Sequence, residues 1–290
     1  MKKHAYLIMV HNQPDLLKKL VTLLDDERND IYIHADIKMN NFQENEYREI
    51  IKSANIFFTE RTNIKWGSYS QIHCELLLLK EAVKREHRYY HLLSGVDLPI
   101  KSQNVIHEFF ERYDGLEFVD EDNETINEKC LERIKYYHIL NYRKNRLSEL
   151  LKNSSMAFQN KLGVNRLEAY KDVKFQKGRN WFSITHEFAK YVIGKEKWLE
   201  QLFEKSFCAD ELFLQTLARN SKFEAKICNS ITMPEIPDTR HIDWTRGYPY
   251  VFQDGDYEEL KSVEALFARK FDLNVDQNII ERIYADMLNS

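Results

Sequence analysis

Short apolar runs alternate with amphipathic segments through the first 120 residues. Residues 5–10 (AYLIMV) are the first run, and their length and composition predict a strand buried on both faces. The pattern recurs in four further runs, at residues 31–34, 55–59, 89–93 and 115–119. Between the runs, Pro14 begins a predicted helix, and residues 68–85 carry apolar side chains at helical spacing. This alternation predicts an α/β fold with a mainly parallel sheet flanked by helices.

The second half of the chain has a less regular pattern. Residues 123–160 are polar and basic, which favours an exposed helical segment, and residues 174–185 have the composition of a strand. Helices are predicted at residues 186–193, 196–205, 210–219, 257–268 and 274–287. Residues 236–252 contain two prolines and one glycine, as expected for a functional loop. Because the chain has no internal repeat, we predict a single domain over residues 1–290.

The charge balance narrows the range of functions. The 42 basic and 46 acidic side chains give a net charge of −4, which argues against a general nucleic-acid-binding protein. No apolar run reaches the ~20 residues of a membrane span, and the N-terminus leads into a predicted strand rather than a signal sequence. The four cysteines are scattered without metal-ligand spacing, as expected for reduced thiols. We therefore expect a soluble, cytoplasmic protein.

Polar residues follow the predicted strands at the edge where a parallel sheet binds its ligands. In such sheets, ligands lie beyond the carboxyl ends of the strands. These ends and the loops after them contain Val10, His11, Asp36, Trp66 and Asp97. Asp36 is either a hydrogen-bond acceptor for a base or ribose, or a turn-forming residue. The sequence has neither GxGxxG nor GxxxxGK followed by Ser or Thr, so a dinucleotide or P-loop phosphate cradle is not expected.

Two Asp-x-Asp triplets are candidates for holding a divalent ion. Asp120 and Asp122 flank Glu121 directly after a predicted strand, which is a plausible context for a metal. Asp254 and Asp256 flank a glycine before a predicted helix, where aspartates cap backbone N–H groups without any metal. A solvated acidic turn explains the first triplet equally well, so both interpretations stay open.

Asp210 and Glu211 begin a predicted helix. Asp210 has the position of an N-cap, and the helix dipole favours an ionised carboxylate at Glu211. Such a carboxylate at the mouth of a cleft could also take a proton from a hydroxyl.

Several cations follow in the C-terminal part of the chain, beside aromatic residues. Arg240, Arg246, Arg269 and Lys270 accompany Trp244 and could hold a diphosphate. Surface charge is the alternative, and Arg269 with Lys270 would then end a predicted helix.

Eight stretches of the sequence together resemble one enzyme family. They are AYLIMVHNQPDLLKKL, YIHADIK, IKWGSYSQIHCELLLLKEAV, YYHLLSGVDLPIKS, KGRNWFSIT, CADELFLQTL, RHIDW and LFARKFD, from residue 5 to about residue 272. In composition and order they resemble the core-2/I-branching glycosyltransferases, which include β-1,6-N-acetylglucosaminyltransferases and peptide O-xylosyltransferases. The small size is typical of a bacterial-type member.

The resemblance implies a GT-A type fold and an inverting transfer from a UDP-sugar donor. Residues 1–120 would then form the nucleotide-sugar-binding half, and residues 121–290 the acceptor-binding and catalytic half. The family's catalytic base falls on Glu211, and a family lysine that contacts the donor diphosphate falls on Lys270. The family arginine falls nearest Arg246, with Arg240 as an alternative. Asp97 stands where other GT-A enzymes keep a metal triplet, but a second acid is missing, which implies transfer without a metal cofactor.

The resemblance divides the candidate residues between two substrates. The donor-binding set is Val10, His11, Asp36, Trp66, Asp97, Arg240, Arg246 and Lys270. The acceptor-binding set is Glu117, Arg133, Lys135, Trp181, Asp210 and Trp244. The acceptor is a glycan or a lipid-linked oligosaccharide, and the donor sugar is GlcNAc, xylose or glucose.

Three alternatives stay open from the sequence. The first is a metal-dependent GT-A transferase that uses Asp120 and Asp122, and the second is a carbohydrate-binding protein without catalysis. The third concerns the basic residues 133–146, which form either a solvated surface or a peripheral contact with the inner face of an anionic membrane. No nucleic-acid partner is expected.

Overall fold

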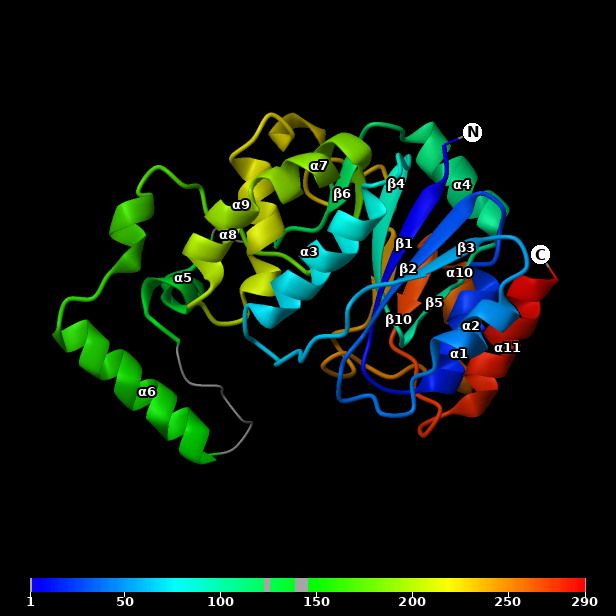
Figure 1. Ribbon diagram of the computed structural model, residues 1–290, viewed down its shortest axis with the longest axis horizontal. Helices are drawn as coiled ribbons and strands as arrows, with labels where there is room; N and C mark the ends of the chain where they lie inside the picture. The colour runs from blue at the N-terminus through cyan, green and yellow to red at the C-terminus, as the bar shows by residue number, and fades with distance from the viewer. Residues whose placement is uncertain (1, 123–125, 139–145, 290) are drawn as a thin grey trace.

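The computed structural model describes residues 2–122, 126–138 and 146–289, and its centre is a seven-stranded sheet (Figure 1). In spatial order the strands are β3 (Asn55–Phe58), β2 (Asn29–Ala35), β1 (His4–Val10), β4 (Tyr89–Ser94), β7 (Phe182–Thr185), β6 (Glu117–Val119) and β8 (Ile227–Cys228). Only β7 runs antiparallel to its neighbours. The predicted α/β fold with a mainly parallel sheet is therefore confirmed.

A second, smaller sheet lies beside the first. It consists of β5 (Asp97–Pro99), β10 (Phe267–Arg269) and β9 (Arg240–Ile242), with β10 in the middle. This sheet corrects two predictions. Residues 236–252 contain a strand rather than only a loop, and the helix predicted at 257–268 ends at Ser262. Phe267 and Ala268 are fully buried because β10 pairs on both sides, with β5 and with β9.

Helices cover both faces of the large sheet (Figure 1). The helices are α1 (Pro14–Leu23), α2 (Glu44–Ile50), α3 (Ser70–Ala82), α4 (Gln103–Arg112), α5 (Glu128–Lys135), α6 (Arg146–Lys161), α7 (His186–Gly194), α8 (Glu196–Phe203), α9 (Phe213–Arg219), α10 (Tyr257–Ser262) and α11 (Gln277–Leu288). Helices α2 and α4 were not predicted, because each has too few buried residues for a clear apolar pattern. Helix α2 buries only Tyr47, and α4 buries only a few residues. The helix predicted at 210–219 is divided into the 3₁₀ turn Ala209–Glu211 and α9.

The alternation of side chains along β1 divides the core in two. Tyr6 and Ile8 enter a cluster that includes α1 and α11, whereas Ala5 and Leu7 enter a cluster that includes α3 and α7. All four side chains are fully buried. Burial on both faces explains why β1 is a continuous apolar run.

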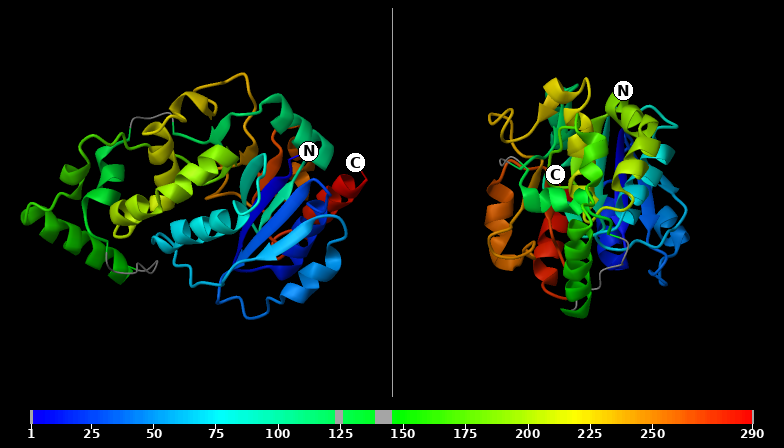
Figure 2. Two further views of the ribbon diagram at one scale, coloured as in Figure 1. Left: turned by 45° about the horizontal axis from the view of Figure 1, so that its top comes forward. Right: turned by 90° about the vertical axis from the view of Figure 1, so that its left-hand side faces the viewer.

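Helices α5 and α6 lie away from the sheet, at one end of the molecule (Figures 1 and 2). Helix α6 is an elongated helix at the periphery, as the basic composition of residues 123–160 predicts. Residues 139–145, which hold part of that basic stretch, lie outside the described residues. None of the described helices combines the length and the hydropathy needed to cross a bilayer.

Candidate active site

The strand order of the large sheet reverses between β1 and β4, and the carboxyl ends of these strands meet there. Because β2 lies on one side of β1 and β4 on the other, this reversal is the expected ligand position. Val10 and Ser94 end the two strands, and Gly95 follows. A Cβ atom on Gly95 would lie 2.6 Å from Val10 Cγ2, so only glycine allows this close approach. Val10 is itself buried and shapes the floor of the site.

Asp36 organises the loop after β2 beside this edge. Its Oδ1 accepts a hydrogen bond from the backbone N of Lys38 at 2.9 Å, and its Oδ2 accepts one from the backbone N of Ile64 at 3.1 Å. The side chain is almost completely buried. Asp36 stabilises the loop, as expected for a turn-forming residue. It also lies beside the strand edge, as expected for a hydrogen-bond acceptor for a base or ribose, so both interpretations stay open.

Positive charges gather around His11, directly after β1. Enclosure by neighbouring atoms lowers the pKa of His11, and the charges of Lys38, Arg269 and Lys270 lower it further, against the opposing effect of Asp36. The lowered pKa of His11 thus indicates that cations from two segments, distant in the sequence, lie near the end of β1. Such a cluster suits a ligand with negative charge.

Arg269 was one of the four cations considered for a diphosphate, but the family resemblance gave it no role. The sequence places it at a helix end, but it lies in β10, and its Nη1 donates to Asp97 Oδ1 at 2.8 Å. Its guanidinium also stacks 4.2 Å from the centre of the Trp181 ring. Asp97 is buried, and burial raises its pKa while the charge of Arg269 opposes the shift. The backbone N of Ser94 donates to the other oxygen of Asp97 at 2.9 Å, so this carboxylate joins β4, β5 and β10.

Lys270 follows Arg269 at the end of β10. Its backbone O accepts a hydrogen bond from Phe252 N at 3.0 Å, and the next residue, Phe271, donates to Val96 O at 3.0 Å. These bonds fix the backbone at Lys270 beside the loop after β4. The predicted donor residues Val10, His11, Asp36 and Lys270 therefore lie in one region.

Arg240 is buried between the two sheets. Its Nη1 donates to Ser183 Oγ at 3.0 Å, and its Nη2 donates to the carbonyl O atoms of Leu92 and Phe182 at 3.2 and 2.7 Å. Burial lowers the pKa of Arg240 to about 10. In this position the guanidinium joins β4 and β7 to β9, so these contacts lend no support to the interpretation of Arg240 as a diphosphate ligand.

Arg246 lies in the loop after β9 and contacts three carboxylates. It pairs with Asp243, with Asp256 Oδ1 at 2.6 Å and with Glu259 Oε2 at 2.9 Å. Its guanidinium also lies 4.3 Å from the centre of the Tyr250 ring. The side chain is 39% exposed, so unlike Arg240 it reaches the surface. In the arrangement described, its charge is already balanced by acidic neighbours.

Glu211 ends the 3₁₀ turn Ala209–Glu211 and contacts Arg133 of α5. Its Oε2 accepts a hydrogen bond from Arg133 Nη1 at 2.7 Å, and its carboxylate is 40% exposed. Burial lowers the pKa of Arg133, but the bond to Glu211 outweighs it and raises the pKa overall. The backbone O of Glu211 accepts a bond from Gly178 N at 3.0 Å, which ties the turn to the loop before β7. The exposed carboxylate can meet a substrate.

Asp210 is buried behind Glu211 and does not act as a cap. The N-cap position of the turn belongs to Cys208, and Asp210 Oδ2 instead accepts a bond from Gln71 Nε2 at 2.8 Å. Burial, with repulsion from Glu211, raises the pKa of Asp210 to about 7. One turn from Gln71 on α3, Glu75 is fully buried, and burial followed by the charge of Asp210 raises its pKa well above the usual value. Neither Gln71 nor Glu75 could be predicted as a site residue, because both lie within an apolar helix.

The other predicted acceptor residues are dispersed. Trp244 is 46% exposed on the loop after β9, whereas Trp181 is buried against Arg269. Lys135 lies near Arg133 on α5, with its Nζ 5.2 Å from the centre of the Tyr136 ring.

Glu117 contradicts its prediction as an acceptor contact. It is fully buried at the start of β6, at the opposite edge of the sheet from Val10. Its carboxylate accepts bonds from Thr185 N at 2.8 Å and from Thr185 Oγ1 at 2.6 Å, and burial raises its pKa to about 7.

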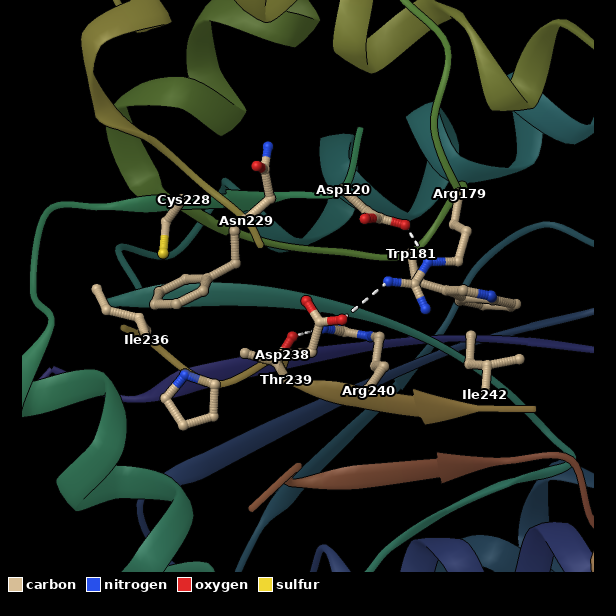
Figure 3. Close-up of a pocket in the computed structure, with 12 residues that line it drawn as sticks. Asp120, Arg179, Trp181, Cys228, Asn229, Ile236, Asp238, Thr239, Arg240 and Ile242 are labelled. Atoms are coloured by element: carbon tan, nitrogen blue, oxygen red, sulfur yellow. Dashed lines mark hydrogen bonds and ion pairs between the residues drawn. The ribbon is translucent and has the colours of Figure 1, made fainter. Parts of the chain in front are cut away.

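A small cavity of about 20 Å³ lies where β6 ends, near β9 (Figure 3). Figure 3 shows the Arg179 side chain between Asp120 and Asp238 at its wall. Arg179 pairs with Asp120, and its Nη2 lies 3.2 Å from Asp238 Oδ2. Asp122 pairs separately with Lys177 Nζ at 2.5 Å. Each aspartate of the alternative metal site is thus matched by its own cation.

Metal ligands do not converge in the part of the chain that the structure describes. Within residues 2–122, 126–138 and 146–289, no three His, Cys, Asp or Glu side chains gather in a way that could hold an ion. The metal-dependent alternative therefore gains no support from these residues.

Comparison with known proteins identifies a family. The model of the family described as Branch: Core-2/I-Branching enzyme matches residues 4–263. Xylosyltransferase 2 of Rattus norvegicus is 24% identical over 96% of this chain and 33% of its own length. The β-1,3-galactosyl-O-glycosyl-glycoprotein β-1,6-N-acetylglucosaminyltransferase of Homo sapiens is 23% identical over 94% of this chain and 66% of its own length. The chain thus spans between about a third and two thirds of these relatives.

A solved structure is also similar. Mouse xyloside xylosyltransferase 1 in its apo form superposes with a TM-score of 0.37 and 9% identity, over 91% of this chain and 96% of that one.

Proposed function

The chain belongs to the Core-2/I-Branching enzyme family, and from this premise we propose that it is an inverting glycosyltransferase of GT-A type. It moves a sugar from a UDP-sugar to a hydroxyl of a glycan acceptor. The observation that carries the proposal is the exposed Glu211 carboxylate, paired with Arg133 at 2.7 Å. A carboxylate that reaches the surface while an arginine holds its position suits a general base.

The donor would bind where β1 and β4 end. The cations around His11 support this position, because a UDP-sugar carries its negative charge on the diphosphate. Asp36 lies beside the same edge and, where its oxygens are not engaged, could accept a hydrogen bond from uridine. Trp66 is 56% exposed in the loop before α3 and offers an apolar surface beside Phe207.

The transfer would be a single displacement. Glu211 accepts the proton of the acceptor hydroxyl, and the hydroxyl oxygen forms a bond to the anomeric carbon of the donor sugar. The bond from that carbon to the diphosphate oxygen breaks on the opposite side, and its electron pair leaves with UDP. Attack opposite the leaving group converts an α-linked donor into a β-linked product. Arg133 holds the Glu211 carboxylate in position.

The negative charge that develops on UDP would be met by fixed cations instead of a metal ion. Lys270 and Arg269 are positioned by β10, so their charges need little reorganisation as the bond breaks. Arg246 could contribute only after releasing part of its carboxylate set, and Arg240 is committed between the sheets. The clamp proposed here therefore centres on Lys270 and includes Arg269, to which the family resemblance gave no role.

Donor binding tests this arrangement. The Lys270→Ala variant should bind UDP at least about tenfold more weakly, because a charge-assisted contact to the diphosphate is lost. Lys226→Ala is the matched control, since Lys226 is an exposed lysine near the opposite edge of the sheet. Titration calorimetry in millimolar EDTA measures both. Equal UDP affinity in the two variants, or UDP binding by the wild type only when Mn²⁺ is added, would contradict the cation clamp.

The sugar and the acceptor are the finer part of the proposal. Relatives are named for xylosyl and N-acetylglucosaminyl transfer, which supports testing UDP-xylose and UDP-GlcNAc first, followed by UDP-glucose. We take the acceptor to be a glycan, in the form of a lipid-linked oligosaccharide presented to a cytoplasmic enzyme. A donor-hydrolysis screen identifies the sugar, because many transferases release it slowly to water. Hydrolysis of none of these donors, together with unaltered sugar binding, would favour a carbohydrate-binding protein.

A further inference from the structure

Helix α6 turns its apolar side chains away from the rest of the molecule. Leu150 is 64% exposed, Leu151 50% and Phe158 63%, and Leu162, directly after the helix, is 64% exposed. Their spacing places them on one side of the helix. We call these four residues the α6 apolar face. Three large apolar side chains at least half exposed on one helix, with a fourth directly after it, are an unusual arrangement in a water-soluble protein.

Polar side chains of α6 fix this orientation from the opposite side. Gln159 Oε1 accepts a bond from the backbone N of Tyr137 at 2.8 Å, and its Nε2 donates to Tyr137 O at 3.0 Å. Asn160 Oδ1 accepts a bond from Tyr136 OH at 3.0 Å. The polar side of α6 thus binds the end of α5, and the apolar face is left toward solvent. This is the reverse of the usual amphipathic packing of a surface helix.

The sequence that contains α6 is basic. From residue 133 to residue 162 the sequence carries seven Lys or Arg residues and one acidic residue, Glu149, although the whole chain has a net charge of −4. Arg146 and Lys161 are exposed at the two ends of α6. Arg143 and Lys144 belong to the same basic stretch but lie outside the described residues. The apolar face and the positive charge therefore occupy the same end of the molecule.

We propose that α6 docks this end of the protein on an anionic lipid bilayer. The four apolar side chains enter the boundary between headgroups and acyl chains, while Arg146 and Lys161 contact anionic headgroups. A second copy of the chain is a poorer occupant, because two such faces would bring like charges together. An apolar face flanked by basic residues is complementary to an anionic bilayer, which has apolar acyl chains inside and negatively charged headgroups outside.

Docking through α6 would also bring the membrane near Glu211. Helix α6 is bonded to the end of α5, and Arg133 of α5 contacts Glu211. A lipid-linked acceptor held in the bilayer would then meet the base directly, a consequence that rests on the proposed function. The docking itself does not rest on it, since vesicle binding needs no donor and no turnover.

Vesicle flotation tests the docking. The full chain is mixed with phosphatidylcholine vesicles, with or without about a third phosphatidylglycerol, at low and at physiological salt. We expect binding to the anionic vesicles and a fall of about tenfold or more in the bound-to-free ratio for a Leu150→Ser, Phe158→Ser variant. The matched control is Val275→Ser, Leu288→Ser, which removes apolar side chains that are 52% and 54% exposed elsewhere. This control should bind like the wild type.

A fluorescent variant gives a second reading that does not depend on loss of binding. Phe158→Trp should show a blue-shifted emission relative to the wild type with anionic vesicles, and quenching by brominated lipids. Absence of both effects, or equal flotation of the α6 variant and its control, overturns the proposal. So does sedimentation showing a dimer of the wild type that the Leu150→Ser, Phe158→Ser variant abolishes, because a second copy would then occupy the face.

Discussion

At the scale of single residues, the contact between Glu211 and Arg133 positions the proposed base. Its Oε2–Nη1 distance of 2.7 Å brings a positive charge against a partly exposed carboxylate. A catalytic group works best when it is held in a fixed geometry relative to the reacting hydroxyl. Arg133 therefore acts on turnover by orienting Glu211.

We predict that Arg133→Gln slows transfer by about tenfold or more, because Glu211 loses the partner that positions its carboxylate. The matched control is Lys129→Gln, which removes an exposed cation from the same helix. Steady-state rates of transfer measure both variants. An unchanged rate in Arg133→Gln would show that the pair has no part in transfer.

A second prediction concerns the buried carboxyl of Asp210 and the pH dependence of stability. Its pKa rises from 3.8 to about 7 on folding. Between these values the folded state holds more protons than the unfolded state, so this group makes the free energy of unfolding fall as pH rises. Glu117, with a pKa raised to about 7, acts in the same direction.

Asp210→Asn should therefore flatten the stability curve between about pH 4 and pH 7, by up to ~1.4 kcal/mol per pH unit for one proton. Urea unfolding across this range measures the slope. The exposed Asp172→Asn serves as control and should leave it unchanged. An identical slope in wild type and Asp210→Asn would mean that Asp210 is ionised in the fold.

At the scale of elements, Arg240 connects the two sheets. Because its guanidinium is engaged there, we expect other cations to bind the donor. Its guanidinium bonds to carbonyl groups of β4 and β7 from its own position in β9. Removal of the guanidinium leaves buried acceptors without partners, which costs about 1–3 kcal/mol for each neutral group.

We predict that Arg240→Met lowers the urea midpoint strongly and that the folded fraction keeps its UDP affinity. Arg112→Met, at an exposed position at the end of α4, is the control for loss of an arginine. A variant with wild-type stability that no longer binds UDP would reverse the assignment and make Arg240 a diphosphate ligand.

The elements themselves show what a sequence can and cannot predict. Strands β1, β2 and β4 are buried on both faces, so their apolar runs are clear in the sequence. The three residues of β10 are too short to show a period, and their apolar run continues that of α10. Pairing with β5 and β9, which are distant in the sequence, makes them a strand.

At the scale of the whole molecule, some residues of the candidate site could be predicted from the sequence and others could not. Val10, His11 and Asp36 were predictable, because the ends of parallel strands meet at one edge. Glu211 and Lys270 came from the family resemblance, whose motifs run through most of the chain. Gln71 and Glu75 could not be predicted, since only the packing of α3 against the turn Ala209–Glu211 gives them a neighbour. Glu117 was misplaced because sequence alone does not tell which end of a short strand faces the site.

Glu211 is proposed as the general base of a transfer that needs no metal ion, and the mechanism depends on this role. The most direct measurement is the rate of sugar transfer by Glu211→Gln relative to wild type, in millimolar EDTA and at saturating donor. We predict full activity of the wild type, a fall of about a hundredfold or more in the variant, and unaltered UDP affinity. Glu200→Gln, an exposed glutamate on α8, should retain the wild-type rate. Near-normal transfer by Glu211→Gln, or activity of the wild type only after Mn²⁺ is restored, would contradict the claim.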